Sequence, residues 1–397
     1  MLDLAVITWD EAFAALRAAL AGTAPALLPL PPGEPGMALA RAAGTASPQV
    51  GTALLLPTSG SAGSPKLVEL GAAALSASAS ATHARLGGPG RWLLALPLTH
   101  VAGWQVVVRS LVAGTQPAVL HDSPGAAPFT AELFTRGAVS SGARYTALVP
   151  AQLGRLLDDR AATAALARFD AVLLGGAATP QALHRRAVDA GVRVVRTYGM
   201  TETCGGCVYD GVPLEGVGVR TAADGRVLIS GPVLATGYLG DDGYRYDDGY
   251  LGDDGYGGDD VDIWVQDRDG RRWFRTSDHG TLDADGRLHV DGRLDDQIVT
   301  GGVNLVPGDV EDVLAGLPGV RGVVVVGVPD ADWGQAVVAV VSGRDMDLPT
   351  LAAVRAAVAD RLGAPAAPRR LVVVDAVPLR GIGKPDRAAA QQLAAGP

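Results

Sequence analysis

The sequence contains only two cysteines, and this scarcity limits the sites that it can form. Cys204 and Cys207 make a single C-x-x-C. A structural zinc site requires four ligands, and the sequence offers neither a second cysteine pair nor a histidine pair close to this one, so a zinc module is excluded. Two interpretations stay open: a redox-active pair, or two small residues in a strand of a cytoplasmic enzyme.

Long apolar runs and an excess of basic residues are also missing. No stretch of about 20 consecutive apolar residues occurs, so we expect no membrane-spanning helix. The N-terminus carries Asp3, Asp10 and Glu11 and lacks a basic segment, which predicts a cytoplasmic protein without a signal peptide. The net charge of −9 argues against nucleic acid as the main partner. The oligomeric state stays open, with a homodimer among the alternatives.

The 397 residues that are present exceed one simple core, so we expect two or more domains. Up to about residue 200, helical patterns alternate with short apolar runs, which predicts α/β layers with a mainly parallel sheet. The predicted helices span residues 9–20, 71–86, 101–112, 151–158 and 180–190. The predicted strands span residues 50–56, 66–70, 92–98, 119–120, 171–174 and 192–196, and residues 24–48 are predicted to be a loop.

The pattern changes beyond residue 207. Short strand patterns separated by Gly/Asp turns continue to residue 292, and a compact α+β module follows. That module has predicted strands at 323–328, 337–341 and 371–374 and a predicted helix at 349–361. We place the boundary at 292–296, which gives a large N-terminal domain of residues 1–292 and a small C-terminal domain of residues 293–397.

Residues 239–262 stand apart by their composition. LGDDGY occurs twice, and the segment holds nine aspartates and one arginine. A periodic Asp/Gly run can bind Ca²⁺, but the EF-hand pattern with its closing Glu is missing. A solvated insertion is therefore favoured over a calcium site.

Residues 55–66, LLPTSGSAGSPK, have the composition of a loop that binds phosphate. Glycines let backbone N–H groups turn inward, hydroxyls add donors and a lysine adds charge. No Gly-Lys-Ser/Thr follows the glycines, so this is not a Walker A loop. A flexible linker is the alternative, although a linker rarely joins two apolar strands. The candidate phosphate ligands are Thr58, Ser59, Gly60, Ser61, Gly63 and Lys66.

Residues 197–203, TYGMTET, place an aromatic ring, a hydroxyl and a carboxylate on one tight turn. Tyr198 offers a face for adenine, Thr201 a donor for phosphate and Glu202 an acid for Mg²⁺. An enzyme that holds ATP requires this combination of groups.

Five motifs in a fixed order resemble the adenylate-forming superfamily. They are TSGSAGSPK, YGMTE, RTSDHG, GRLDDQI and a lysine near the C-terminus, and they span about residues 50–390. The superfamily includes acyl-CoA synthetases, peptide-synthetase adenylation domains and luciferases. The resemblance implies that a carboxylate attacks the α-phosphate of ATP to give acyl-AMP, and that a thiol then displaces AMP. It also implies a large N-terminal domain and a small mobile C-terminal domain that rotates between the two steps.

The resemblance implies a role for each matching residue. Adenine stacks on Tyr198 and lies along Gly175, Gly176, Ala177 and Ala178, with Gly199 and Met200 in the same nucleotide-binding turn. Thr201 contacts phosphate, Glu202 coordinates Mg²⁺, Asp278 accepts the ribose hydroxyls, Arg293 lies beside ribose and phosphate, and Asp295 is the hinge. Lys384 bridges the carboxylate and the α-phosphate during adenylation, and Gly301 and Gly302 help to form the pantetheine tunnel. Ser277 and Val303 depart from the usual pattern, which leaves contacts near the ribose and in the tunnel less defined.

Two residues bear on the choice of acid. The resemblance implies that His100, in the motif LPLTHVAG, lines the entrance or wall of the acyl pocket as a candidate gate and catalytic residue, with a structural histidine as the alternative. Arg109 lies in a mostly apolar segment, so it requires either an internal acid or a substrate carboxylate.

Three stretches, YTALVPAQLGRLL, VLLGGAATP and TYGMTETCGGCVYDGVPLEGV, more narrowly resemble the o-succinylbenzoate–CoA ligases of menaquinone biosynthesis. That resemblance implies ATP, Mg²⁺ and coenzyme A, and an aromatic dicarboxylate as substrate. Arg109 then holds the carboxylate that is not activated, as a charge-assisted clamp.

Three other functions stay open. The chain could be a different aryl- or acyl-CoA ligase in which Arg109 forms a structural salt bridge. It could be a stand-alone adenylation enzyme that loads a carrier protein, which activity with free CoA would distinguish. An inactive nucleotide-binding protein is the third, and the intact Thr201, Glu202, Asp278 and Lys384 argue against it.

Overall fold

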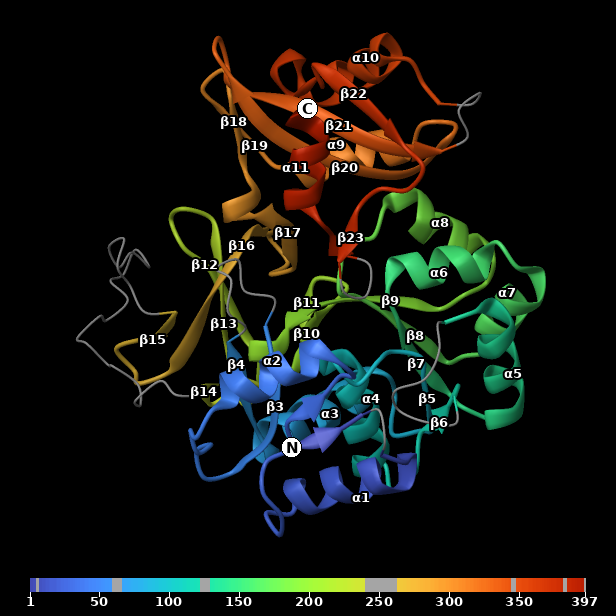
Figure 1. Ribbon diagram of the computed structural model, residues 1–397, viewed down its shortest axis with the longest axis vertical. Coiled ribbons are helices and arrows are strands. Elements are labelled where there is room, and N and C mark those ends of the chain that lie inside the picture. The colour runs from blue at the N-terminus through green and yellow to red at the C-terminus, as the bar shows by residue number, and fades with distance from the viewer. Residues whose placement is uncertain are drawn as a thin grey trace.

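The computed structural model places the C-terminal elements, from β18 onward, above the rest of the chain (Figure 1). It describes residues 1–4, 7–58, 66–121, 129–239, 263–343, 348–380 and 384–395. The acidic insertion, apart from residue 239, and the central part of the predicted phosphate loop lie outside these residues. No helix in the described ranges is long and apolar enough to cross a membrane.

A seven-stranded sheet forms the centre of the larger part. Its strand order is β11-β10-β9-β8-β7-β5-β6, and the five strands from β9 to β6 are parallel. The strands are β5 (Trp92–Leu94), β6 (Ala118–Val119), β7 (Tyr145–Leu148), β8 (Ala171–Leu174), β9 (Val194–Met200), β10 (Gly205–Tyr209) and β11 (Val212–Pro213). Parallel strands end at the same edge of a sheet, so the loops after β7, β8 and β9 meet there.

Helices cover both faces of this sheet, as expected when parallel strands are apolar on both sides. One core joins α1 (Trp9–Leu20), α3 (Ala72–Arg85) and α4 (Val101–Val112) to the sheet. A second core on the opposite face includes residues of α5 (Ala131–Ser141), α6 (Pro150–Leu157), α7 (Arg160–Leu166) and α8 (Gln181–Asp189).

Smaller antiparallel sheets flank the central one. The first has the order β14-β4-β3 and consists of β3 (Thr52–Pro57), β4 (Leu67–Gly71) and β14 (Gly237–Tyr238). The second consists of β12 (Gly218–Thr221), β13 (Arg226–Ser230), β15 (Trp264–Gln266), β16 (Arg272–Leu282) and β17 (Leu288–Arg293). Two short strands, β1 (Leu2–Asp3) and β2 (Pro29–Leu30), pair near the N-terminus.

The upper part is built on one five-stranded sheet that follows the short turn η2 (Leu294–Asp296). Its strands are β18 (Ile298–Thr300), β19 (Val303–Leu305), β20 (Val320–Asp330), β21 (Gly334–Gly343) and β22 (Arg370–Val374). α9 (Pro307–Ala315) and α10 (Leu351–Leu362) pack on one core, and α11 (Arg387–Ala395) packs on another. The short turn η3 (Ala364–Ala366) follows α10.

A hairpin reaches from the upper part toward the lower one. It pairs β23 (Leu379–Arg380) with β24 (Lys384–Pro385), and in Figure 1 β23 lies at the junction between the upper and lower parts. This hairpin brings Lys384 within electrostatic reach of Glu202, which follows β9.

The α/β fold class predicted from the sequence is confirmed, whereas the predicted loop at residues 24–48 is wrong. That segment contains β2 and the helix α2 (Glu34–Ala43). Pro35 lies in the first turn of α2, where no intrahelical N–H donor is required, so the proline does not prevent the helix. The domain boundary at 292–296 stays a prediction; in the structure, β17 ends at Arg293 and the next sheet begins at Ile298.

Candidate active site

Glycines at the ends of β8 and β9 allow unusually close backbone contacts. A Cβ atom on Gly175 would lie 2.3 Å from the hydroxyl oxygen of Thr197, and one on Gly199 would lie 2.1 Å from the carbonyl oxygen of Gly205. Real Cβ atoms do not approach so closely, so these positions exclude any side chain. Gly176 follows with φ +82°, and Ala177 and Ala178 continue the loop. The backbone positions Gly175 and Gly199, next to Thr197 and Tyr198, therefore have no room for a side chain.

Tyr198 and Asp278 are in direct contact. The Tyr198 hydroxyl donates a hydrogen bond of 2.7 Å to Oδ2 of Asp278. Burial raises the pKa of both groups, while Arg293 and Lys384 oppose the rise at Asp278. Arg293 lies opposite Asp278 in the pairing of β16 with β17. The structure thus brings together three of the predicted nucleotide-binding residues.

Glu202 lies on the short turn η1 (Thr201–Thr203) and is 8% exposed. The Tyr238 hydroxyl donates a 2.9 Å hydrogen bond to one of its carboxylate oxygens. Burial raises the pKa of Glu202, and the cations Lys384 and Arg293 act in the opposite direction. The Lys66 ammonium lies 5.2 Å from the centre of the Tyr238 ring, so the end of the predicted phosphate loop approaches the predicted Mg²⁺ ligand.

Of the predicted phosphate loop, only Thr58 and Lys66 lie within the described residues. The Thr58 N–H donates to the Lys66 carbonyl at 2.9 Å, which closes the base of the loop at the ends of β3 and β4. Ser59, Gly60, Ser61 and Gly63 lie outside the described residues.

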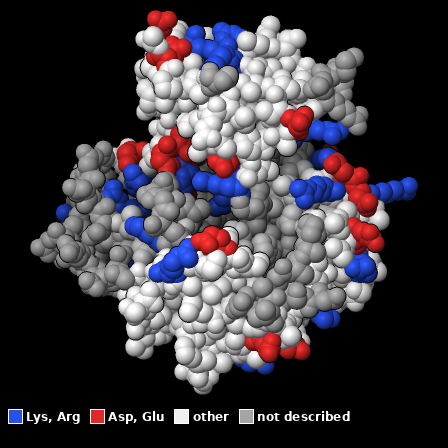
Figure 2. Space-filling model, in the orientation of Figure 1, with Lys and Arg blue, Asp and Glu red and all other residues white. Residues whose placement is uncertain are grey.

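Lys384, on β24 of the upper part, lies close to Asp278, Glu202 and Arg293. Desolvation by the surrounding protein lowers the pKa of Lys384, even though the residue keeps access to solvent; the nearby Arg293 and Arg380 lower it further. Asp278 and Glu202 act in the opposite direction. Figure 2 shows Lys and Arg side chains in the hollow between the two parts, with acidic side chains along its upper rim. The predicted catalytic cation and the predicted nucleotide ligands Asp278 and Glu202 therefore lie within electrostatic reach of one another.

His100 occupies the N-cap position of α4, and its imidazole interacts electrostatically with Lys384. Burial and the charge on Lys384 both lower the pKa of its imidazole. The ring is therefore neutral at pH 7, as expected of a residue that shapes a pocket rather than one that binds an anion.

Arg109 lies on α4 but is separate from the cluster. It is nine residues beyond His100, about 13 Å along the helix axis. Its guanidinium donates a 3.3 Å hydrogen bond to the Tyr209 hydroxyl and lies 5.0 Å from the Trp92 ring centre. The side chain is buried, its Nε has no hydrogen-bond partner, and no carboxylate of the described chain forms an ion pair with it. The internal acid considered from the sequence is therefore absent from the described residues.

Gly301 and Gly302 lie apart from the nucleotide cluster, at the tip of the β18–β19 hairpin. Both have positive φ, +57° and +78°, which suits a two-residue hairpin turn. A Cβ on Gly301 would lie 2.7 Å from the Trp333 ring, so the close packing of this tip also requires glycine.

Both cysteines are free and buried. Burial raises the pKa of Cys207 to about 12 and raises the pKa of Cys204 as well. A thiol that stays protonated is a poor nucleophile, so the structural interpretation of the C-x-x-C is favoured over the redox one.

Family models match the chain in two segments. An AMP-binding enzyme model covers residues 40–239, and a model of the C-terminal domain of AMP-binding enzymes covers residues 309–384. The chain belongs to the AMP-binding enzyme family.

Within this family, the chain is similar to several CoA ligases. It is 46% identical to the probable 2-succinylbenzoate–CoA ligase of Mycobacterium tuberculosis, over 96% of this chain and 94% of that protein. It is 32% identical to the indoleacetate–CoA ligase of Aromatoleum aromaticum, over 88% of this chain and 69% of that protein. A solved structure of the Bacillus subtilis o-succinylbenzoate CoA synthetase with its acyl-adenylate intermediate is 25% identical, with a TM-score of 0.69 and coverage of 86% of this chain and 69% of that one.

Two contributors to this candidate site were not predicted from the sequence. Tyr238 reaches Glu202 only because β14 pairs with β4. The Thr276 hydroxyl accepts the Asp278 N–H at 3.0 Å and donates to the Val227 carbonyl at 2.9 Å, so it fixes the turn that presents Asp278. A threonine two residues before an acid is a recognisable turn signal, whereas the Tyr238 contact has no local signal.

Proposed function

We propose that the protein is an ATP-dependent 2-succinylbenzoate–CoA ligase of menaquinone biosynthesis, acting in the cytoplasm. It joins the acid to AMP with release of pyrophosphate, and then transfers the acyl group from AMP to the thiol of coenzyme A. Similarity along nearly the whole length of the mycobacterial ligase supports the reaction and the acid. The structural observation that carries the proposal is Arg109, a buried guanidinium without a carboxylate partner in the described chain.

Arg109 provides the buried positive charge that a second substrate carboxylate requires. No carboxylate of the described residues forms an ion pair with it, and its described partners are the Tyr209 hydroxyl and the face of the Trp92 ring. His83 stays neutral, because burial and the charge on Arg109 lower its pKa to about 4. An anion that enters this region meets a cation whose desolvation is already complete, so the charge-assisted contact discriminates strongly against monocarboxylates.

Tyr198 and Asp278 orient the nucleotide. The Asp278 carboxylate has two oxygens, and Tyr198 occupies only Oδ2 through a single donor. The remaining acceptor capacity suits the hydroxyls of a ribose, while the Tyr198 ring supplies an adenine-stacking face.

Glu202 fits a Mg²⁺ ion that is bound mainly through phosphates. Mg²⁺ in nucleotide enzymes takes one or two carboxylates and completes its shell with substrate oxygens and water. Tyr238 orients Glu202 by donating a hydrogen bond to one of its carboxylate oxygens. No group of three or more metal-binding side chains occurs in the described ranges, which argues against an all-protein metal cage. When bound, the ion would neutralise phosphate charge.

Lys384 then supplies positive charge where the new bond forms. As the carboxylate oxygen attacks the α-phosphate, negative charge grows on the phosphate oxygens and on the departing pyrophosphate. An ammonium held beside the site stabilises that charge, an effect that contributes about 3 kcal/mol or more in comparable sites. Arg293 adds a second cation near the ribose and phosphate.

The second step is proposed to use a different arrangement of the two domains. Rotation at the 292–296 boundary would remove Lys384 and bring the Gly301–Gly302 tip toward the acyl-adenylate, where a glycine tip leaves room for the pantetheine arm.

The proposed function is tested by thioester formation with ATP, Mg²⁺ and CoA. Two acids form the sharpest comparison: 2-succinylbenzoate and 3-benzoylpropanoate, which has the same succinyl arm but lacks the ring carboxylate. We expect turnover with the first and a kcat/KM lower by at least about ten-fold with the second. Indoleacetate should not react. Equal turnover of both acids, or preference for indoleacetate, would favour an aryl-CoA ligase of different specificity, and adenylation without CoA transfer would favour loading of a carrier protein.

A further inference from the structure

Arg387 is held by two acidic side chains that belong to different elements. Its Nε donates to Oδ2 of Asp296 at 3.0 Å, and its two terminal nitrogens donate to the Glu311 carboxylate at 2.5 and 3.2 Å. One of these nitrogens also donates to the Val325 carbonyl at 2.8 Å. Only 20% of the side chain is exposed, so these contacts are shielded from much of the solvent. All three guanidinium nitrogens are therefore engaged, and the orientation of the group is fixed.

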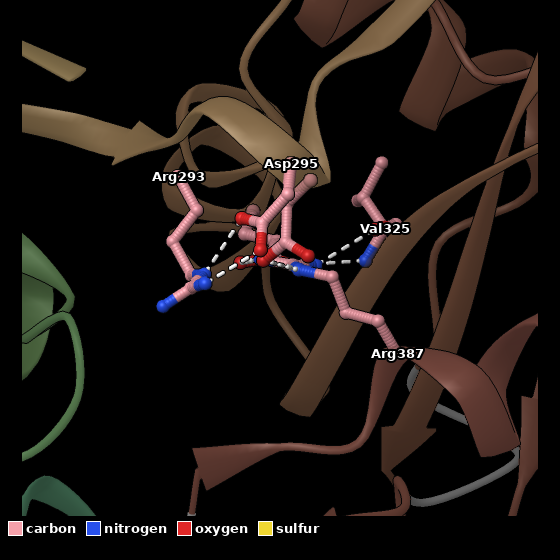
Figure 3. A network of polar contacts seen from close by, with 6 residues as sticks. Arg293, Asp295, Val325 and Arg387 are labelled. Atoms are coloured by element: carbon pink, nitrogen blue, oxygen red, sulfur yellow. Dashed lines mark hydrogen bonds and ion pairs between the residues drawn. The ribbon is translucent and has the colours of Figure 1, made fainter. Parts of the chain in front are cut away.

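The turn η2 is held by arginines on both sides. Arg293 binds Asp295 through two hydrogen bonds of 2.8 and 2.5 Å, and Arg387 binds the next residue, Asp296. Figure 3 shows the two guanidinium groups reaching the turn from opposite directions. One of these arginines contributes to the nucleotide site, and the other begins α11.

Arg387 is also tied closely to Lys384. It follows Lys384 by three residues, and the backbone between them is fixed at its start and at its end. Lys384 pairs with Arg380 in the hairpin, and the Asp386 N–H donates to the Pro378 carbonyl at 3.0 Å. Asp386 in turn accepts the Ala389 N–H at 3.1 Å, in the manner of a helix N-cap. The chain from Lys384 to Arg387 is thus a short rigid connection between the hairpin and α11.

We propose that Arg387 is a positioning residue for adenylation, which holds Lys384 over the nucleotide by binding Asp296 in the η2 turn. Arg387 has two separable contacts in this scheme. The bond to Glu311 attaches the start of α11 to α9, whereas the bond to Asp296 sets the position of Lys384 relative to the turn that follows Arg293. This inference rests on the proposed function, because it assigns Lys384 to the first half-reaction only.

The decisive variant is Asp296→Ala, which removes one contact of Arg387 and leaves the Glu311 contacts in place. Asp296 is partly exposed, at 31% of its side chain, so its truncation leaves no cavity in the core. Arg387→Lys is the conservative companion: it keeps the charge but cannot bind Asp296 and Glu311 at once. Asp158→Ala serves as the matched control, because it removes a 2.7 Å ion pair with Arg186 on the surface of α6 and α8.

Each variant is assayed for two half-reactions and for thermal unfolding. Adenylation is followed by acid-dependent exchange of pyrophosphate into ATP, and thioester formation by adding CoA to purified acyl-adenylate. For Asp296→Ala we expect exchange to fall by about 10- to 100-fold, the loss typical of a charge-assisted hydrogen bond, while thioester formation and the melting temperature stay close to wild type. Arg387→Lys should retain an intermediate exchange rate, and Asp158→Ala should match wild type in all three measurements.

The outcomes separate this inference from the proposed function. If Asp296→Ala leaves exchange unchanged, or lowers both half-reactions by the same factor, Arg387 does not position Lys384. If wild type shows no exchange with 2-succinylbenzoate, the proposed substrate is wrong, and the same variants are then compared with the acid that does support exchange.

Discussion

The Tyr198 hydroxyl donates a 2.7 Å hydrogen bond to the carboxylate of Asp278, a residue 80 positions later in the chain. β9 and β16, which belong to different sheets, are joined at this point. Because burial raises the pKa of Tyr198 well above its ordinary value, the phenol stays protonated and remains the donor. The residue proposed to stack on adenine and the residue proposed to bind the ribose are therefore held together by this hydrogen bond.

Replacing Tyr198 with Phe keeps the ring and removes only this donor. We expect the apparent KM for ATP to rise about 10- to 100-fold, since a hydrogen bond to a charged group contributes about 1.5–3 kcal/mol. The KM for CoA should not change, and it serves as the internal control in steady-state kinetics. An unchanged KM for ATP would show that the hydroxyl does not help to orient Asp278.

Removing the ammonium of Lys384 should separate the two half-reactions. Lys384→Ala is expected to lower pyrophosphate exchange by about 100-fold or more, because a cation beside the developing charge is lost. Conversion of preformed acyl-adenylate to thioester should persist near the wild-type rate. An equal loss in both steps would contradict the role assigned to Lys384.

The lowered pKa of Lys384 predicts how adenylation depends on pH. The charged form is required, so the exchange rate should fall as pH rises through a pKa that lies below the ordinary value of 10.5. Lys384→Arg keeps its charge at all accessible pH values, and its smaller residual rate should decline only at higher pH. The measurement is the pH–rate profile of exchange from neutral pH upward. If wild type and Lys384→Arg lose activity over the same alkaline pH range, a group other than Lys384 causes that loss.

Replacing Arg109 with Ala should weaken the use of 2-succinylbenzoate but not that of 3-benzoylpropanoate. The apparent KM for 2-succinylbenzoate should rise about ten-fold or more, as expected for loss of a charged hydrogen bond. The kcat/KM for 3-benzoylpropanoate, which lacks the ring carboxylate, should stay the same. Equal losses with both acids would mean that Arg109 only supports the packing around Trp92 and Tyr209.

The buried thiols should resist modification in the folded protein. Burial raises the pKa of both Cys204 and Cys207, so little thiolate forms at neutral pH. We expect iodoacetamide to label neither residue in native protein and both after denaturation, as counted by mass spectrometry. Rapid labelling of either thiol in native protein would restore the redox interpretation.

Much of the fold could be predicted because its strands and helices have strong local signals. The predicted helix at 101–112 has the same bounds as α4, and the strand at 171–174 coincides with β8. The prediction was wrong at residues 24–48, where the many proline and glycine residues indicated a loop although α2 forms there. The elements α5, α7 and β7 were not predicted at all. The site shows the same limit. Motifs identified Tyr198, Glu202 and Asp278, but the contact of Tyr238 with Glu202 depends on strand pairing that no local pattern reports.

The environment of Arg109 also has a consequence for the protein before it binds substrate. Burial lowers the pKa of this guanidinium, which means that the fold holds its positive charge at a free-energy penalty. A dicarboxylate that binds there would cancel part of that penalty, in addition to the general stabilisation by ligand. The substrate-free enzyme is therefore expected to be the less heat-resistant form, and occupation of this one buried charge is expected to raise its melting temperature.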